Sequence, residues 1–251
     1  MFSIQDRERL RDRVLELASS DRRVVAGAVV GSLADGEGDR WSDLDLSFAV
    51  ADNLSVHDVL ADWTRRLAGE FDAVHLFDLP VGSSIYRVFL LPGCLQFDLS
   101  FTPASDFGAM GPKFRTLFGT TVPKPHVPPP PADELFGYAV HHAVRARFCL
   151  ERGRYWQAEY WVSAVRDYAL SLACRRRGLP ARYGRGFDDL PVEVRNVFRS
   201  ALPTSLERDE LLRALAIAVE QLLSERDEIR AIAAKVEPRL RELIDNCLPS
   251  S

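Results

Sequence analysis

Cysteine is scarce in this sequence: there are four in 251 residues, and none forms a Cys-x-x-Cys pair. Structural zinc sites and redox-active dithiols need such close spacing, and secreted domains held by disulfides carry a higher density of cysteine. We therefore expect neither a zinc site nor a disulfide framework. The thiols of Cys94, Cys149, Cys174 and Cys247 are expected to be reduced.

Positive charge is also in short supply. The formal net charge is -4, the sequence pI is about 5.8, and Lys113, Lys124 and Lys235 are the only lysines. Proteins that hold a nucleic acid backbone need an excess of basic side chains to neutralise its phosphates. The sequence thus argues against a polymerase or a tRNA-modifying enzyme, and no nucleic acid partner is expected.

Long apolar runs are missing as well. No stretch approaches the roughly 20 apolar residues of a membrane-spanning helix, and the N-terminal MFSIQDRERLRDRVLEL is charged throughout, unlike a secretion signal. We expect a cytoplasmic protein without a membrane partner. With 47% hydrophobic and 27% charged residues, the chain is long enough for two modest domains with separate cores.

The most informative pattern is residues 24–50, VVAGAVVGSLADGEGDRWSDLDLSFAV. An apolar, β-branched run ends at Gly31-Ser32, a polar segment follows, and alternation with a period of two resumes at Asp43. The pattern predicts a strand, a tight turn, a short helix and a second strand. On that second strand Asp43 and Asp45 share one face, and the leucines between and after them face a core.

Two carboxylates on one face oppose each other's ionisation unless a cation lies between them. Hard oxygen ligands favour Mg²⁺ or Mn²⁺, and Mg²⁺ is commonly bound by one or two carboxylates together with substrate phosphates. At the turn, Gly31 lets phosphate oxygens approach the backbone, where N–H groups and the Ser32 hydroxyl can hold them. An isolated Asp-x-Asp is usually a solvated strand face and an isolated Gly-Ser a turn. In this order they indicate metal-assisted phosphoryl chemistry.

The stretch GSLADGEGDRWSDLDL resembles the signature of the DNA polymerase β-like nucleotidyltransferase superfamily. That signature is Gly-Ser or Gly-Gly, about ten further residues, and Asp-x-Asp or Asp-x-Glu flanked by apolar residues. The resemblance implies that Gly31 and Ser32 hold the β and γ phosphates of a nucleoside triphosphate. It implies that Asp43 and Asp45 bind the metal.

In one respect the sequence departs from small bacterial members of this superfamily. Many of them carry a basic residue before the glycine that Gly36 matches, and this chain has Asp35 there. Arg40 is a candidate replacement for the missing phosphate contact. With Ser42, it completes the set of residues that we expect to bind the nucleotide.

A third acid is expected at Asp98. Residues 73–80 read as a strand and 85–101 as a hairpin that turns at Pro92-Gly93. In the second arm, alternation places Gln96, Asp98 and Ser100 on one face. The superfamily resemblance implies a third acid on a strand beside the Asp-x-Asp strand, and Asp98 matches in order and context.

The role of Asp98 has two alternatives. It either completes the metal site or accepts the proton of the attacking hydroxyl, as the resemblance implies for some small-molecule members. Asp72 and Asp78 compete for the same position but fit it less well, one at a helix–strand junction and the other beside a proline. The plain alternative is that Asp98 is an exposed hairpin charge.

Residues 103–131 are rich in proline and glycine and show little periodicity. We place the domain boundary there: a catalytic domain over 1–122, a semi-rigid proline-rich linker over 123–131 and a helical domain over 132–251. Lys113 and Arg115 lie in this stretch, and they either reach the triphosphate or remain solvated loop charges.

Beyond Ala132 the apolar residues recur with a helical period, which predicts an up-and-down bundle. Pro238, inside the last stripe, predicts a kink or break near Glu237. The four stripes are Phe136, Val140, Ala143 and Val144; Val162, Val165, Ala169 and Leu172; Leu211, Leu215, Ala218 and Leu222; and Ile229, Ile232, Val236, Leu240 and Leu243.

The predicted fold class is therefore an α/β (α+β) nucleotidyltransferase domain with a mixed sheet, followed by an all-α bundle. In organisation this resembles the kanamycin, streptomycin and lincosamide nucleotidyltransferases, and the resemblance implies that the bundle closes an acceptor site. Acids and aromatic rings suit a cationic or sugar-like acceptor. The candidates are Glu151, Tyr155, Trp156, Glu159 and Asp167.

Residues 183–191 either line that site or cap the following helix through Asp189. His57, in the first turn of a predicted helix over residues 55–70, is interpreted as a solvated side chain. His141 and His142 have no partner at the spacing of metal ligands, and we interpret them as structural.

The first functional hypothesis is an enzyme of the EC 2.7.7 class. It would transfer a nucleoside monophosphate, AMP from Mg-ATP or the equivalent from another triphosphate, to a hydroxyl of a small molecule. An aminoglycoside- or lincosamide-like antibiotic is the acceptor suggested by family analogy. The alternative is a nucleotide-binding or regulatory module of a toxin–antitoxin type pair. Transfer to a protein side chain also stays open, as does a homodimer.

Overall fold

The computed structural model describes residues 1–225 and 227–245. The chain forms two compact units, Met1–Val127 and Pro128–Ser251, which are described separately below. Their boundary falls inside the proline-rich segment 123–131. Cys247 lies outside the described residues, whereas Cys149 and Cys174 are buried and Cys94 is exposed.

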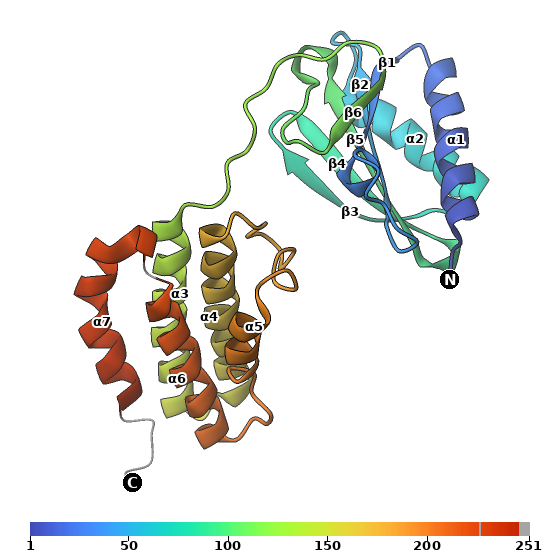
Figure 1. Cartoon of the computed structure of the whole chain (residues 1–251). Helices are drawn as coiled ribbons and strands as arrows, with labels where there is room; N and C mark the ends of the chain where they lie inside the picture. The colour runs from blue at the N-terminus through green and yellow to red at the C-terminus, as the bar shows by residue number, and fades with distance from the viewer. Residues whose placement is uncertain (226, 246–251) are drawn as a thin grey trace. The chain divides into compact units, whose positions relative to one another are not determined.

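The first unit is built on one mixed six-stranded sheet with strand order β3-β4-β5-β2-β1-β6 (Figure 1). β2 and β5 run parallel, and every other neighbouring pair is antiparallel. This confirms the predicted mixed sheet. The elements are α1 (Ile4–Ser20), β1 (Val24–Val30), η1 (Gly31–Leu33), β2 (Leu44–Val50), α2 (Val56–Phe71), β3 (Val74–Val81), β4 (Ser84–Leu91), η2 (Pro92–Cys94), β5 (Leu95–Pro103), η3 (Ala104–Asp106) and β6 (Phe114–Phe118).

The helices α1 and α2 cover one face of this sheet (Figure 1). α1 begins with a capping box, in which Ser3 and Asp6 exchange hydrogen bonds, and Ser55 caps α2. Both helices bury apolar stripes against the strands, where Trp63 of α2 meets the ring of Phe101 edge-on at 5.5 Å. The core therefore lies between the helices and the apolar face of the sheet, as the alternation predicts.

The opposite face carries no helix within residues 1–127, all of which are described. The segment 104–124 crosses part of it, and Phe107 packs on the small side chains of Ala26, Ala28 and Ala49. Within this segment the structure contains β6, which the sequence reading missed because the region shows no alternation. β6 is a five-residue edge strand that pairs with β1. It extends the sheet and brings Lys113 and Arg115 to its rim.

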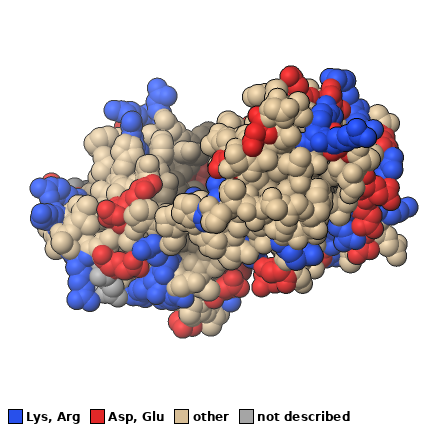
Figure 2. Space-filling view, turned by 90° about the horizontal axis from the view of Figure 1, so that it is seen from above, with Lys and Arg blue, Asp and Glu red and all other residues tan. Residues whose placement is uncertain are grey.

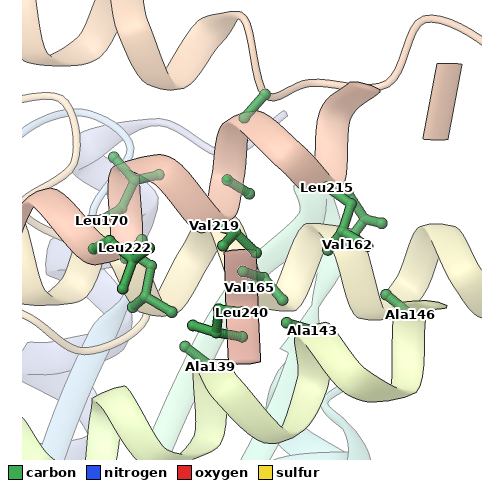
Figure 3. Packing of buried hydrophobic residues seen from close by; sticks show 14 of the residues in the cluster. Ala139, Ala143, Ala146, Val162, Val165, Leu170, Leu215, Val219, Leu222 and Leu240 are labelled. Atoms are coloured by element: carbon green, nitrogen blue, oxygen red, sulfur yellow. The ribbon is translucent and has the colours of Figure 1, made fainter. Parts of the chain in front are cut away.

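The second unit is entirely helical outside its loops, which confirms the predicted all-α bundle. Alanines of α3 lie against valines of α4 and let the two helices approach closely, as Figure 3 shows for Ala143 and Val165. The helices are α3 (Ala132–Glu151), α4 (Tyr155–Arg176), α5 (Val192–Arg199), α6 (Arg208–Ser224), η4 (Asp227–Ile229) and α7 (Arg230–Asp245).

One local prediction in the bundle is wrong, and another is wrong in part. Pro238 does not break its helix, because α7 continues on both sides of it, with Ala233 and Leu240 held in the core; the kink near Glu237 stays a prediction. Asp189 does not cap the following helix. Pro191 precedes α5 instead, with a φ of -51° that suits a helix start.

Charges are dispersed over the surface. In the view of Figure 2, basic and acidic side chains lie in small groups close to one another, other residues cover a broad part of the visible face, and no continuous basic field is seen there. Among the helices of residues 1–225 and 227–245, none combines the length and the apolar character that a bilayer crossing requires.

The end of α1 provides a stability test. Asp21 accepts hydrogen bonds from the Arg23 guanidinium and from the indole nitrogen of Trp63 at 3.0 Å. The bond from Arg23 is the main reason that the pKa of Asp21 falls from 3.8 to about 2. Because the folded-state pKa is lowered, the stabilisation is present above the unfolded pKa and disappears as the pH falls through the folded one.

We therefore expect Asp21→Asn to lower the free energy of unfolding by about 1 to 2 kcal/mol at pH 7, and by about half as much at pH 3. Urea unfolding at both pH values measures this, with Asp12→Asn as the control, because Asp12 is exposed and pairs only with Arg11. If the loss of stability in Asp21→Asn were the same at both pH values, the ionised Asp21 carboxylate would not be the source of the stabilisation.

Candidate active site

Three carboxylates meet on the face of the sheet that has no helix. The parallel pairing of β2 and β5 places Asp45 directly opposite Asp98, and Asp43 lies immediately before β2. One carboxylate oxygen of each lies within 4.8 Å of the others, and all three side chains are half-buried. The structure thus brings together the three acids that the sequence singles out, although Asp43 precedes the strand instead of belonging to it.

The electrostatics of this acidic trio, Asp43, Asp45 and Asp98, are unfavourable for three anions. Burial raises the pKa of Asp98 above its usual value, and the negative charge of Asp43 raises it further. A hydrogen bond from the Gln96 amide at 3.0 Å acts in the opposite direction without cancelling the effect. A cation among the carboxylates would remove this penalty.

The Gly31-Ser32 turn lies against the trio. β1 ends at Val30, and Gly31 begins the single turn η1 with a φ of +70°. A Cβ at this position would lie 2.4 Å from Oδ2 of Asp45. Glycine is therefore required both for the backbone conformation and for the space beside the carboxylate. The Ser32 side chain is half-buried, and it makes no hydrogen bond to the residues described.

Basic side chains from the rim of the sheet lie beside this turn. The backbone N–H of Gly31 donates to the carbonyl of Lys113 at 3.1 Å, and Nε of Arg115 donates to the carbonyl of Ala34 at 3.1 Å. The Lys113 ammonium pairs with Asp35 at 3.2 Å. This chain has Asp35 where many small bacterial members of the superfamily carry a basic residue. In the structure, Lys113 places a basic group next to Asp35.

Arg40 and Ser42 are engaged within the turn that leads to Asp43. The Arg40 guanidinium lies 4.3 Å from the centre of the Trp41 ring and donates to the carbonyl of Phe2. The Ser42 hydroxyl exchanges hydrogen bonds with Asp39. Nη1 of Arg7, on α1, donates hydrogen bonds to the backbone carbonyls of Asp39 and Ser42 and so connects this turn to the helix. These contacts support the position of Asp43, and nucleotide binding by Arg40 and Ser42 stays a prediction.

A cavity of about 140 Å³ lies on the same face of the sheet, lined by Ser47, two residues beyond Asp45 on β2. Two buried hydroxyl pairs mark its floor: Ser100 donates to Ser47, and Ser84 bonds Thr102, each at 2.7 Å. Its lining includes Lys113 and Lys124, two of the three lysines in the chain. Its other lining residues are Val30, Tyr86, Asp106, Phe107, Gly108, Met110, Gly111 and Phe114.

Tyr86 is the residue of this site that sequence reasoning missed. It lies opposite Ser100 on the face of the trio, and burial together with the charge of Asp45 raises the pKa of its hydroxyl. The hairpin pattern contained the signal. A turn at Pro92-Gly93 fixes the register that brings Val88 opposite Asp98 and therefore Tyr86 onto the same face.

The remaining candidates are described by their local contacts. Asp72 ends α2 in a left-handed conformation, and Asp78 pairs with Arg87, so neither joins the trio. In the bundle, Glu151 and Asp167 are held by arginines at 2.7 and 2.8 Å. Glu159 accepts from Ser163, whereas Tyr155 and Trp156 are exposed. His142 packs on Trp161, and its Nδ1 is buried without a partner among the described residues.

Comparisons with known proteins add little. No family model matches this chain, and no curated protein matches it. Among solved structures, an aminoglycoside 6-adenyltransferase from Bacillus subtilis is similar, with 12% sequence identity and a TM-score of 0.36. The match covers 97% of this chain and 99% of that one. A likeness of this strength supports no statement about this chain, so the proposals below depend on the site itself.

The crowding of negative charge has a measurable consequence. Removing one charge from the trio should stabilise the protein in the absence of divalent cations, because Asp98 then ionises at less cost. We expect Asp43→Asn to raise the free energy of unfolding by roughly 0.5 to 1 kcal/mol in a chelating buffer. Thermal unfolding beside Asp12→Asn measures this, and a lower stability of Asp43→Asn would show that the trio is not strained.

Proposed function

We propose that the first unit is the catalytic unit of a metal-dependent nucleotidyltransferase. It moves a nucleoside monophosphate, AMP when the donor is ATP, to a hydroxyl of a small molecule. One observation carries the proposal: three carboxylates within 4.8 Å of one another adjoin a Gly-Ser turn whose glycine has no room for a side chain. The superfamily resemblance of residues 31–46 supports the same function.

The donor set fits a hard divalent cation. Among the residues that the structure describes, the cluster consists of three carboxylates without a histidine or cysteine, which favours Mg²⁺ or Mn²⁺ over softer metals. Asp43, Asp45 and Asp98 would hold the ion, and its chemistry there is to neutralise the charge of the triphosphate and of the entering oxygen. The raised pKa of Asp98 is consistent with a site that lacks a compensating positive charge.

The protein side chains around the trio have distinct roles in this proposal. Gly31 and Ser32 hold the β and γ phosphates, and Lys113 lies beside the turn to balance their charge. A bond forms between the acceptor oxygen and the α phosphorus, the bond from that phosphorus to the bridging oxygen breaks, and pyrophosphate leaves with the electron pair. The hydroxyl proton passes either to Asp98 or to solvent. In the latter case, Asp98 serves as a ligand only.

The glycine contact gives a sharp test of the metal site. In Gly31→Ala the new methyl group collides with Asp45, whereas in Gly36→Ala, where φ is +82°, it meets open space. Both substitutions impose backbone strain, so only the first should also displace a metal ligand. We expect about a tenfold loss or more of Mn²⁺ affinity for Gly31→Ala alone, measured by titration calorimetry. Equal losses in both variants would mean that backbone strain, not the carboxylate, is responsible.

The activity itself is tested with labelled ATP, Mg²⁺ and a panel of aminoglycosides, lincosamides and simple glycosides. We expect Mg²⁺-dependent release of pyrophosphate and a labelled adenylylated product, with about a hundredfold loss or more in Asp45→Asn and none in Asp12→Asn. Tight ATP binding without turnover of any acceptor would favour the nucleotide-binding module instead.

A further inference from the structure

The acidic trio lies in the middle of a row that crosses the sheet. The printed register places Phe77 opposite Val88, Val88 opposite Asp98, and Asp98 opposite Asp45. On the far side of Asp45 lies Gly31, followed by Lys113 at the rim. The two sides of the trio therefore differ. The β1 and β6 side has the Gly31-Ser32 turn with a basic group, and the β4 and β3 side has apolar side chains.

Val88, next to Asp98, is buried, and beyond it apolar side chains form an exposed strip on the face of the trio. Val74, Phe77, Leu79 and Val81 of β3 are 57, 49, 52 and 46% exposed, and Leu90 of β4 is 38% exposed. The register places all five on that face, because their partners alternate with the residues of β4 that point into the core. An exposed apolar cluster of this extent usually marks a binding surface.

The strip carries no charge within the fully described strands β3 and β4. Asp78 and Arg87 pair with each other, and Nη1 of Arg87 donates to Thr64 of α2, so both lie on the helix side. His75 lies opposite the buried Phe89, also on that side. The surface beside the trio thus offers contact to an apolar group and no carboxylate to an ammonium group.

The direction of the reaction connects the strip to the acceptor. In an in-line transfer, the entering and leaving oxygens lie on opposite sides of the transferred phosphorus. If the leaving pyrophosphate is held at Gly31, Ser32 and Lys113, the acceptor enters from the side of Val88 and Phe77. We propose that this apolar strip binds the acceptor, and that the acceptor is a hydroxyl compound with an extended apolar face. The inference rests on the function proposed above.

Strand pairing with a second copy fits this edge less well. β3 has an irregular register between His75 and Phe77, and Pro80 lacks the N–H that a further strand would need. Both features oppose the addition of a strand to the edge of the sheet. The apolar face of the strip remains available, which favours a small molecule lying across it.

Two matched glucosides test the inference. Octyl β-D-glucopyranoside, kept below its micelle concentration, and methyl β-D-glucopyranoside carry the same sugar hydroxyls and differ only in the apolar chain. We expect the octyl compound to bind about tenfold tighter or more in the presence of Mg²⁺ and a non-hydrolysable ATP analogue. The same preference is expected in kcat/KM for pyrophosphate release, and lincomycin should be preferred over kanamycin A.

The variant Phe77→Gln/Leu79→Gln removes the apolar contact without opening the core, because both side chains are about half exposed. It should abolish the preference for the octyl compound through a higher KM and leave the affinity for the nucleotide analogue unchanged. Leu54→Gln, at a leucine 39% exposed in the turn before α2, is the control and should behave like the unmodified protein.

Several outcomes would overturn the inference. One is equal binding of the two glucosides, and another is an undiminished preference in Phe77→Gln/Leu79→Gln. A third is a dimer in sedimentation experiments that this variant dissociates without a change in KM, which would assign the strip to a second copy. Failure of the proposed function is recognised separately, because no acceptor of the panel, glucosides included, would then give Mg²⁺-dependent release of pyrophosphate that Asp45→Asn abolishes, even if the nucleotide analogue binds.

Discussion

The parallel pairing of β2 with β5 is the constraint on which the site depends. It fixes Asp45 opposite Asp98, and the residues on either side of them hold the two strands in the core. Leu44, Leu46, Phe97 and Leu99 are all 0% exposed. Burial of apolar side chains on one face of the sheet thus brings the carboxylates together on the other face. The packing energy outweighs the repulsion between the carboxylates, although the packed residues take no part in the chemistry. A bound cation would offset the repulsion among the three carboxylates, which is why their proximity favours a metal site.

The two flanks of the trio give the site a direction. On one side, a glycine with no space for a methyl group adjoins Lys113, whose ammonium group is paired with Asp35 and Glu37 and can exchange these partners for phosphates. On the other side, the sheet continues into apolar side chains without a charge. A reaction that separates an entering from a leaving group needs such an asymmetry.

Sequence alone predicts the parts of this site that depend on local pattern. Alternation around Asp45 and Asp98 identifies both strands and the faces of both acids. The same alternation contained the signal for Tyr86, although the sequence analysis missed that residue. The alternation does not reveal the pairing of β2 with β5, because residues 53 positions apart leave no local signal of their partners. β6 was missed for a related reason: an exposed edge strand of five residues needs no alternation, and its pairing with β1 alone defines it. The contact of Lys113 with the Gly31 turn depends on that pairing.

The measurement that tests the central claim most directly is anomalous diffraction from crystals grown with Mn²⁺ and a non-hydrolysable nucleoside triphosphate. The account predicts an anomalous peak at about 2.1 to 2.2 Å from carboxylate oxygens of Asp43 and Asp45, with the triphosphate extending toward Gly31 and Ser32. Manganese bound elsewhere, with the three carboxylates free of both metal and nucleotide, would contradict it.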